Sequence, residues 1–205
     1  MARRNSSKLI TNIEDILNVH RLEDPRVEFK RSWNTGSTAW RVLYTICAFA
    51  NDFLNDDGGY IIIGVGDKPS EDGNVDVEGV NAESLDKVQG TITKLCKAHI
   101  RPEYQPRLSP EVHKGKHLLA IWATPSENGP HQCRESAKGN FHYYIRKATG
   151  TVKATPEEES QLISQQRKTP FDERMAIDRG KRSKRAIKFL CGNCLTIYKI
   201  KFSLN

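Results

Sequence analysis

The hydrophobic positions in the first third of the chain follow two different periods. Apolar residues spaced three and four apart predict a helix over residues 13–22. A second helix is predicted from about Ser37 to Asp52, and its apolar residues cover most of its circumference, which is typical of a buried helix. The run YIIIGV at 60–65 is apolar without interruption, so it predicts a central strand covered on both faces.

The remaining elements follow from alternation, periodicity and capping signals. They are a strand at 27–30, a helix at 83–99, strands at 103–108, 116–123 and 141–147, and a helix starting at Thr155 and ending near Arg167. Residues 124–140 are rich in Pro, Gly, Ser and charge, and are predicted to form a loop. The order of helices and strands indicates a chain that mixes both in one domain.

The positive charge of the chain is concentrated at its C-terminal end. The formal net charge is +7, but residues 179–205 hold eight Lys or Arg and no Asp or Glu. The preceding residues are close to neutral, so overall basicity does not show that the body binds nucleic acid. We expect a flexible N-terminus at 1–11, one domain at 12–167 and a basic tail at 168–205, which is either a native extension or a truncation or frameshift scar.

Two further absences in the sequence bear on location. No apolar run approaches the roughly 20 residues that a membrane helix needs. The first residues, MARRNSSKLITNIEDIL, contain no apolar signal core. We therefore expect a cytoplasmic protein that does not bind to membranes.

The stretch EDPRVEFKRS carries the first candidate chemistry. Glu28 and Lys30 share a face of the predicted strand, because side chains alternate with a period of two. Pro25 breaks that strand, so Glu23 can fold back towards Glu28, and paired carboxylates bind hard divalent cations. The alternative is an exposed Glu–Lys pair on an edge strand, and this stretch alone favours the alternative.

Asp67 follows the predicted central strand within the sequence GVGD. A carboxylate just beyond the end of such a strand is well placed to join a site. A simple turn explains the same residues, and the glycines form neither a dinucleotide fingerprint nor a P-loop.

Four separate motifs occur in a recognisable order: VEFKRS, ICAFANDFLNDDGGYIIIGVGD, HLLAIWATPSENGPH and FHYYIRKATGTVKATPEEE. Together they resemble the Schlafen-type AlbA-like domain, a family also described as DNA-binding and formerly as a divergent AAA domain. The resemblance is to prokaryotic-type members and covers about residues 12–166. It implies an α/β (α+β) fold with a mixed sheet flanked by helices, and a domain that handles RNA or DNA.

The resemblance also implies a site. Schlafen nucleases cut tRNA and rRNA with three acidic residues that bind Mg²⁺ or Mn²⁺, and the matching positions here are Glu23, Glu28 and Asp67, with Lys30 as the motif lysine. Animal Schlafens pair two such lobes around a groove, so this single lobe would form a homodimer to build a comparable one.

Three functions remain open. The first is a nucleic-acid-binding module, such as a transcriptional regulator, with these phosphate-binding or base-stacking candidates: Lys30, Arg31, Arg134, Tyr143, Arg146 and Lys147. The second is a metal-dependent endoribonuclease that uses the three carboxylates and Lys30. The third is an ATP-binding regulator, for which the sequence offers no phosphate loop.

Overall fold

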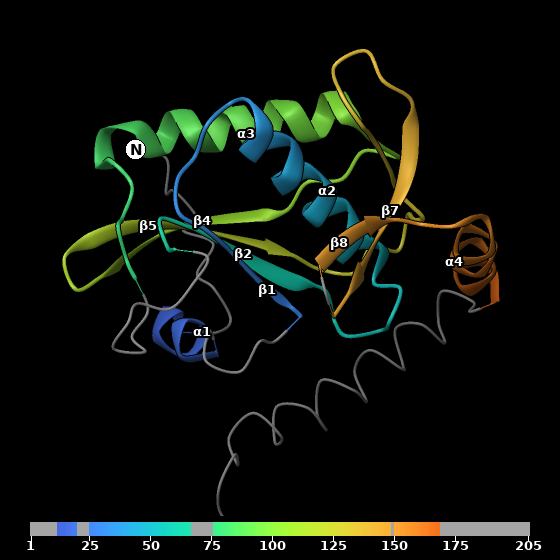
Figure 1. The fold of residues 1–205 in the computed structure, drawn as a ribbon, viewed down its shortest axis with the longest axis horizontal. Coiled ribbons are helices and arrows are strands. Elements are labelled where there is room, and N and C mark those ends of the chain that lie inside the picture. The colour runs from blue at the N-terminus through green and yellow to red at the C-terminus, as the bar shows by residue number, and fades with distance from the viewer. Residues whose placement is uncertain (1–11, 20–24, 67–75, 149, 169–205) are drawn as a thin grey trace, which may run out of the picture. The chain divides into compact units, whose positions relative to one another are not determined.

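The computed structural model describes residues 12–19, 25–66, 76–148 and 150–168 (Figure 1). The chain divides into two units, residues 1–166 and 167–205. The described residues lie in the first unit, except that its last helix continues to Lys168. Gly192-Asn193 in the basic tail predicts a hairpin turn, and these residues lie outside the described ones.

A four-stranded mixed sheet forms the centre of the domain. Its strands lie in the order β1 (Val27–Lys30), β2 (Gly59–Ile63), β5 (Lys116–Ala123) and β4 (Arg107–His113). β1 pairs with β2 in parallel, whereas β2, β5 and β4 pair antiparallel. The prediction of a mixed sheet is thus confirmed, and β1 is an edge strand of it.

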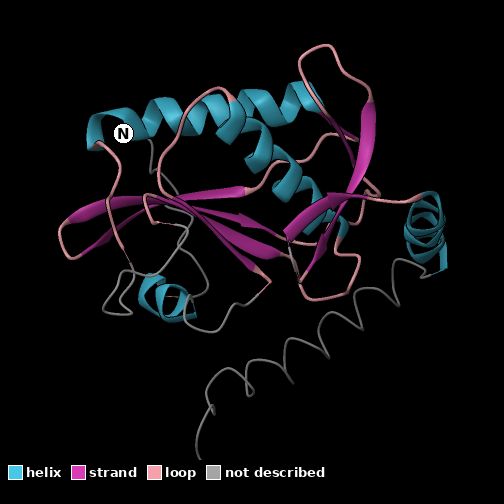
Figure 2. Ribbon diagram, viewed as in Figure 1, coloured by secondary structure: helices cyan, strands magenta, loops and turns pink. Residues whose placement is uncertain are grey.

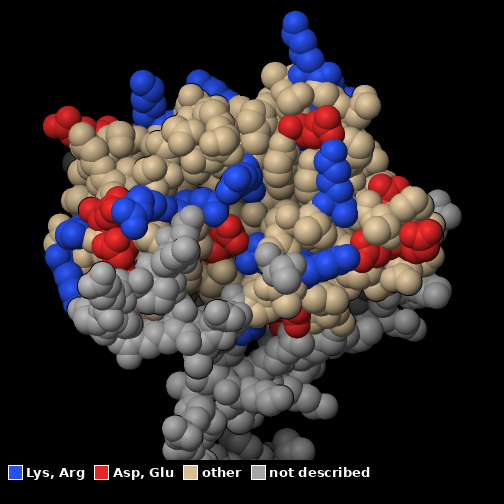
Figure 3. Space-filling view, in the orientation of Figure 1, with Lys and Arg blue, Asp and Glu red and all other residues tan. Residues whose placement is uncertain are grey.

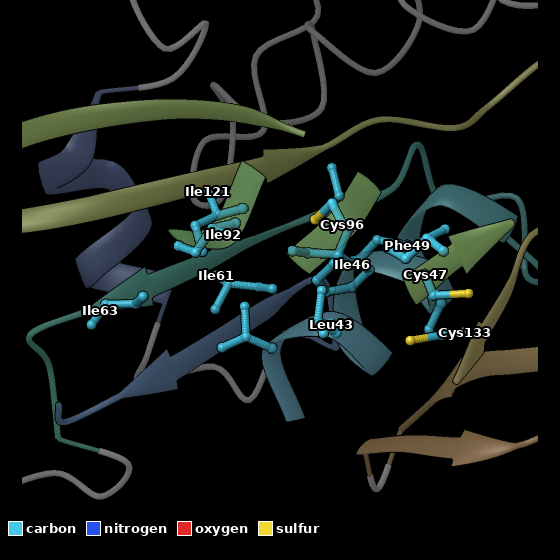
Figure 4. Packing of buried hydrophobic residues seen from close by; sticks show 14 of the residues in the cluster. Leu43, Ile46, Cys47, Phe49, Ile61, Ile63, Ile92, Cys96, Ile121 and Cys133 are labelled. Atoms are coloured by element: carbon cyan, nitrogen blue, oxygen red, sulfur yellow. The ribbon is translucent and has the colours of Figure 1, made fainter. Parts of the chain in front are cut away.

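The two faces of this sheet bury different residues because side chains alternate along each strand. Ile61 and Ile63 face a core built with α2 (Ser37–Asn51) and α3 (Leu85–His99), where Figure 4 shows side chains from both helices meeting those of β2. Ile62 faces the opposite side, in a cluster with residues of α1 (Ile13–Val19). Helices therefore cover both faces, which explains the uninterrupted apolar run of β2.

A second, antiparallel sheet packs against the other side of α2 (Figure 2). Its strands lie in the order β3 (Ile100–Arg101), β6 (Gln132–Arg134), β7 (Phe141–Lys147) and β8 (Gly150–Lys153). The last helix, α4 (Pro156–Lys168), follows β8 directly, and a short 3₁₀ helix, η2 (Ala82–Ser84), precedes α3. Within the described residues no helix is long and apolar enough to cross a membrane.

The second sheet is where the predicted elements depart from the structure. β6 lies inside the segment predicted as a loop, and β8 has no counterpart among the predicted strands; both are short. The strand predicted at 103–108 begins only at Arg107, after Pro106, which has no N–H to donate to a sheet. The capping box of α4 is confirmed by reciprocal bonds between Thr155 and Glu158.

A buried amide is one of the links between helix α2 and the second sheet. The Nδ2 of Asn51 donates to the carbonyl oxygens of His131, at 2.9 Å, and Tyr144, at 3.0 Å. The backbone N–H of His131 donates to the Oδ1 of Asn51 at 2.7 Å. Asn51 is 3% exposed, so water cannot readily take its place as a partner for these groups.

Replacing Asn51 by Ala should therefore destabilise the domain strongly. The His131 N–H and the Tyr144 carbonyl would be left buried without partners, at a cost of about 3 kcal/mol in the free energy of unfolding. Urea denaturation followed by circular dichroism measures this loss. Asn140→Ala, which truncates an exposed Asn, is the control and should change the free energy by less than about 0.5 kcal/mol; equal effects of the two substitutions would contradict this account.

Candidate nucleic-acid interface

Glu28 and Lys30 lie on the same face of β1, as the strand period predicts. The Nζ of Lys30 is 2.5 Å from the Oε1 of Glu28. Their side chains are only 12% exposed for Lys30 and 23% for Glu28. The pair is on an edge strand, but it is not the exposed pair that the simpler interpretation of the sequence expects.

Arg146 of β7 covers this pair from the second sheet. Its Nη1 donates to the Oε2 of Glu28 at 2.8 Å, and its Nε donates to the carbonyl oxygen of Pro25 at 2.6 Å. Its guanidinium also lies 5.4 Å from the centre of the Phe49 ring of α2. Arg146 thus joins β1, α2 and β7, and both carboxylate oxygens of Glu28 are bound to cations.

This arrangement keeps Glu28 ionised. Burial by itself raises the pKa of a carboxyl group, but the contacts with Lys30 and Arg146 outweigh burial and hold the pKa of Glu28 below its ordinary value. A small pocket lined by Pro25, Phe49 and Arg146 adjoins the network and encloses about 20 Å³, which is room for about one water molecule.

The predicted metal ligands Glu23 and Asp67 lie outside the described residues. Within the described part of the chain, no group of three or more His, Cys, Asp or Glu side chains could hold a metal ion. Glu28 is the one of the three carboxylates whose surroundings the structure shows. The three-carboxylate site therefore stays a prediction that depends on Glu23 and Asp67.

Two other candidate phosphate ligands are engaged in ion pairs at the surface. Arg31 pairs with Glu78 at 2.6 Å and with Asp76 at 3.2 Å. Lys147 pairs with Glu158 of α4 at 2.7 Å. With Lys30 and Arg146, four of the five predicted phosphate-binding cations therefore have carboxylate partners.

Arg134 is different, because among the described residues no carboxylate lies within ion-pair distance of it. Its Nη1 donates to the carbonyl oxygen of Gly139 at 3.2 Å, and its guanidinium lies 4.6 Å from the centre of the Phe141 ring. Arg101 of β3 also lies over that ring, at 4.7 Å. Sequence patterns did not single out Arg101 and Phe141, because only the pairing of β3, β6 and β7 brings them beside Arg134.

The candidate Tyr143 and its neighbour Tyr144 in β7 have separate environments. Tyr144 is 3% exposed and stacks on Tyr44 of α2 with ring centres 4.4 Å apart, so it belongs to the core. Tyr143 points to the opposite face and is half-buried. Burial, followed by the nearby charge of Glu159 in α4, raises the pKa of Tyr143. Of the two, only Tyr143 is placed to contact a ligand.

Comparison with known proteins identifies relatives of this domain. A protein-family model described as "Schlafen, AlbA_2" matches residues 23–155. Among solved structures, the solution NMR structure of the N-terminal domain of a "Putative ATP-dependent DNA Helicase RecG-related Protein" from Nitrosomonas europaea is similar, with a TM-score of 0.48 and 23% identity over 69% of this chain and 88% of that one. The crystal structure of the DIP2311 protein from Corynebacterium diphtheriae has a TM-score of 0.46 and 16% identity over 72% of this chain and 25% of that one. A search of curated proteins gave no match.

Removing the charge of Glu28 should lower the free energy of unfolding of the domain and make it depend less on pH in the acid range. Because the folded-state pKa of Glu28 is lowered, its carboxylate stabilises the fold above the unfolded-state pKa of about 4.5. That stability is lost as the pH falls through the lowered folded-state pKa. Glu28→Gln should therefore cost about 2 kcal/mol at pH 7, because the amide keeps one uncharged acceptor oxygen and loses the other, and the difference should shrink in acid.

Urea denaturation of both proteins at a series of pH values between about 7 and 3 measures this. Glu111→Gln, which changes a carboxylate that accepts a bond from Ser109, serves as the control. Parallel pH curves for the original protein and the Glu28→Gln variant would show that the network does not keep Glu28 ionised.

Proposed function

Because the chain belongs to the Schlafen AlbA_2 family, we propose that this domain binds nucleic acid. The observation that carries the proposal is the family match over residues 23–155, which covers most of the described domain. The proposal concerns the folded domain and not the basic tail alone.

The charges of the described residues support this proposal. Several exposed or half-exposed cations on α2, α3, β3, β6 and the loop after β6 make no ion pair with another described residue: Arg41, Lys87, Lys94, Lys97, Arg101, Arg134 and Lys138. Figure 3 shows basic side chains projecting along the upper edge of this view, where α3 and the β6–β7 loop lie in Figure 1. Unneutralised Lys and Arg at a surface are what a phosphate backbone attracts.

Fluorescence anisotropy with labelled RNA and DNA oligonucleotides tests the proposal. The full chain should bind, and its affinity should fall steeply as KCl rises from about 50 to 200 mM. The matched variant replaces the six cations of residues 179–188 (Arg179, Lys181, Arg182, Lys184, Arg185 and Lys188) by Gln. Binding that persists in this variant would come from the domain, whereas complete loss would assign it to the tail and contradict the proposal.

One observation favours a second function, metal-dependent RNA cleavage. Glu28 is an ionised carboxylate in contact with Lys30, and these are two of the residues that the family resemblance assigns to the nuclease site. Glu28 would hold Mg²⁺ or Mn²⁺ with Glu23 and Asp67, and the metal would supply Lewis-acid chemistry at a phosphodiester. To bind a metal, Glu28 would have to give up at least one of its contacts with Lys30 and Arg146.

Incubation of the full chain with labelled tRNA, in Mn²⁺ or in EDTA, tests the second function. Cleavage should require Mn²⁺ and should be abolished by Asp67→Asn, which should leave binding unchanged. Asp86→Asn, which neutralises an exposed carboxylate on α3, is the matched control and should cut as the original chain does. Cleavage that survives Asp67→Asn would mean that the predicted site is not responsible.

A further inference from the structure

One face of the second sheet gathers two arginines over a single aromatic ring. Arg134 and Phe141 are directly opposite each other in the β6–β7 ladder, and Arg101 is opposite Gln132 in the β3–β6 ladder. Residues 132 and 134 share a face because the side-chain period of a strand is two. The pairing register therefore places Arg101, Arg134 and Phe141 on the same face, and Tyr143, opposite Gln132, extends it.

The two guanidinium groups are held close together without a compensating charge. Each lies within 4.7 Å of the centre of the Phe141 ring, so they are no more than about 9 Å apart. That upper limit is about one Debye length at physiological salt, so salt screens the repulsion between the two charges only in part. Within the described residues, neither arginine has a carboxylate at ion-pair distance.

Glu135, the carboxylate nearest to Arg134 along the chain, makes its ion pairs on the other face of the sheet. Glu135 pairs with Lys153 of β8 and, at 3.1 Å, with His142 of β7. Burial, followed by the nearby charge of Arg134, lowers the pKa of His99. The face is therefore positive around the Phe141 ring, whereas Tyr143, further along it, lies near the negative charge of Glu159 of α4.

Two more cations lie close in sequence to the residues of this face. Lys97, in the last turn of α3, lies four residues before Arg101, and Lys138, in the β6–β7 loop, lies four residues after Arg134. Four residues of chain span at most about 14 Å even when extended. Both lysines are therefore close enough to contact a nucleic-acid strand that is stacked on the Phe141 ring. Lys97 and Lys138 are both exposed and are in no ion pair among the described residues.

We propose that Arg101, Phe141 and Arg134 form a stacking platform for unpaired bases of a single-stranded nucleic acid, whose phosphates Lys97 and Lys138 contact. This inference rests on the proposed function. It adds that the nucleic acid is single-stranded and that it binds on this face of the second sheet. The bases of a duplex cover each other's faces, whereas those of a single strand can stack on an aromatic ring or on a guanidinium plane. The phosphate charge would also relieve the repulsion between the two arginines.

Anisotropy titrations of the full chain with a labelled single strand, the matching duplex and an abasic strand of equal length test the platform. The single strand should bind more tightly than the other two. Phe141→Leu keeps an apolar side chain but removes the π face, and should weaken single-strand binding at least about fivefold, with no change for the abasic strand. Phe141→Trp should retain the affinity, and Lys97→Gln, which removes one proposed phosphate contact, should reduce the salt slope by about 0.7.

Arg107→Gln is the matched control. It removes a guanidinium that lies over an aromatic ring in the same way, 5.0 Å from the centre of Trp122, but in the first sheet. It should leave the affinity for the single strand unchanged, and thermal melts should show that both Phe141 variants are folded.

The outcomes separate this inference from the proposed function. A chain that binds none of the probes would overturn both. A chain that binds, but binds duplex as tightly as single strand or is insensitive to Phe141→Leu while folded, would overturn the platform and leave nucleic-acid binding standing.

Discussion

The burial of α2 between two sheets is the constraint on which the rest of the domain depends. One side of the helix supplies Leu43 and Ile46 to the core above β2, and the other contacts β6, β7 and β8. Such a helix cannot leave its last polar side chain unsatisfied, so Asn51 bonds to the backbone of Tyr144 in β7 and of His131, the residue that leads into β6. These bonds fix the second sheet relative to the helix, and with it the position of every cation on that sheet.

The two sheets use their arginines in different ways. Arg146 points towards α2 and β1, where Glu28 and the Pro25 carbonyl take up its donors, so it serves as a bridge between the sheets. Arg134, on the opposite face of the second sheet, has only a carbonyl and an aromatic ring as partners among the described residues. Alternation along β6 and β7 thus separates a structural cation from one that can meet an external anion.

The same contrast bears on the acidic motif that the family resemblance suggests. Glu28 and Lys30 have a structural task on this edge strand, because with Arg146 they close the gap between β1 and β7. Glu28 can stabilise the fold and still bind a ligand. Any ligand of Glu28 must, however, compete with two charge-assisted hydrogen bonds, each worth roughly 2 kcal/mol. The proposed binding at Arg101 and Arg134 would break no ion pair among the described residues.

Much of the fold was present in the local pattern. The uninterrupted run of β2, the all-round apolar surface of α2 and the capping box of α4 each specify an element from neighbouring residues alone, and the four motifs specified the family. Only the tertiary structure decided which of the described cations are paired. An arginine is neutralised when folding brings a carboxylate within about 4 Å, and Arg146 and Glu28 meet across 118 residues of chain. Arg101 and Phe141 became neighbours through β6, a three-residue strand too short to leave a period in the sequence.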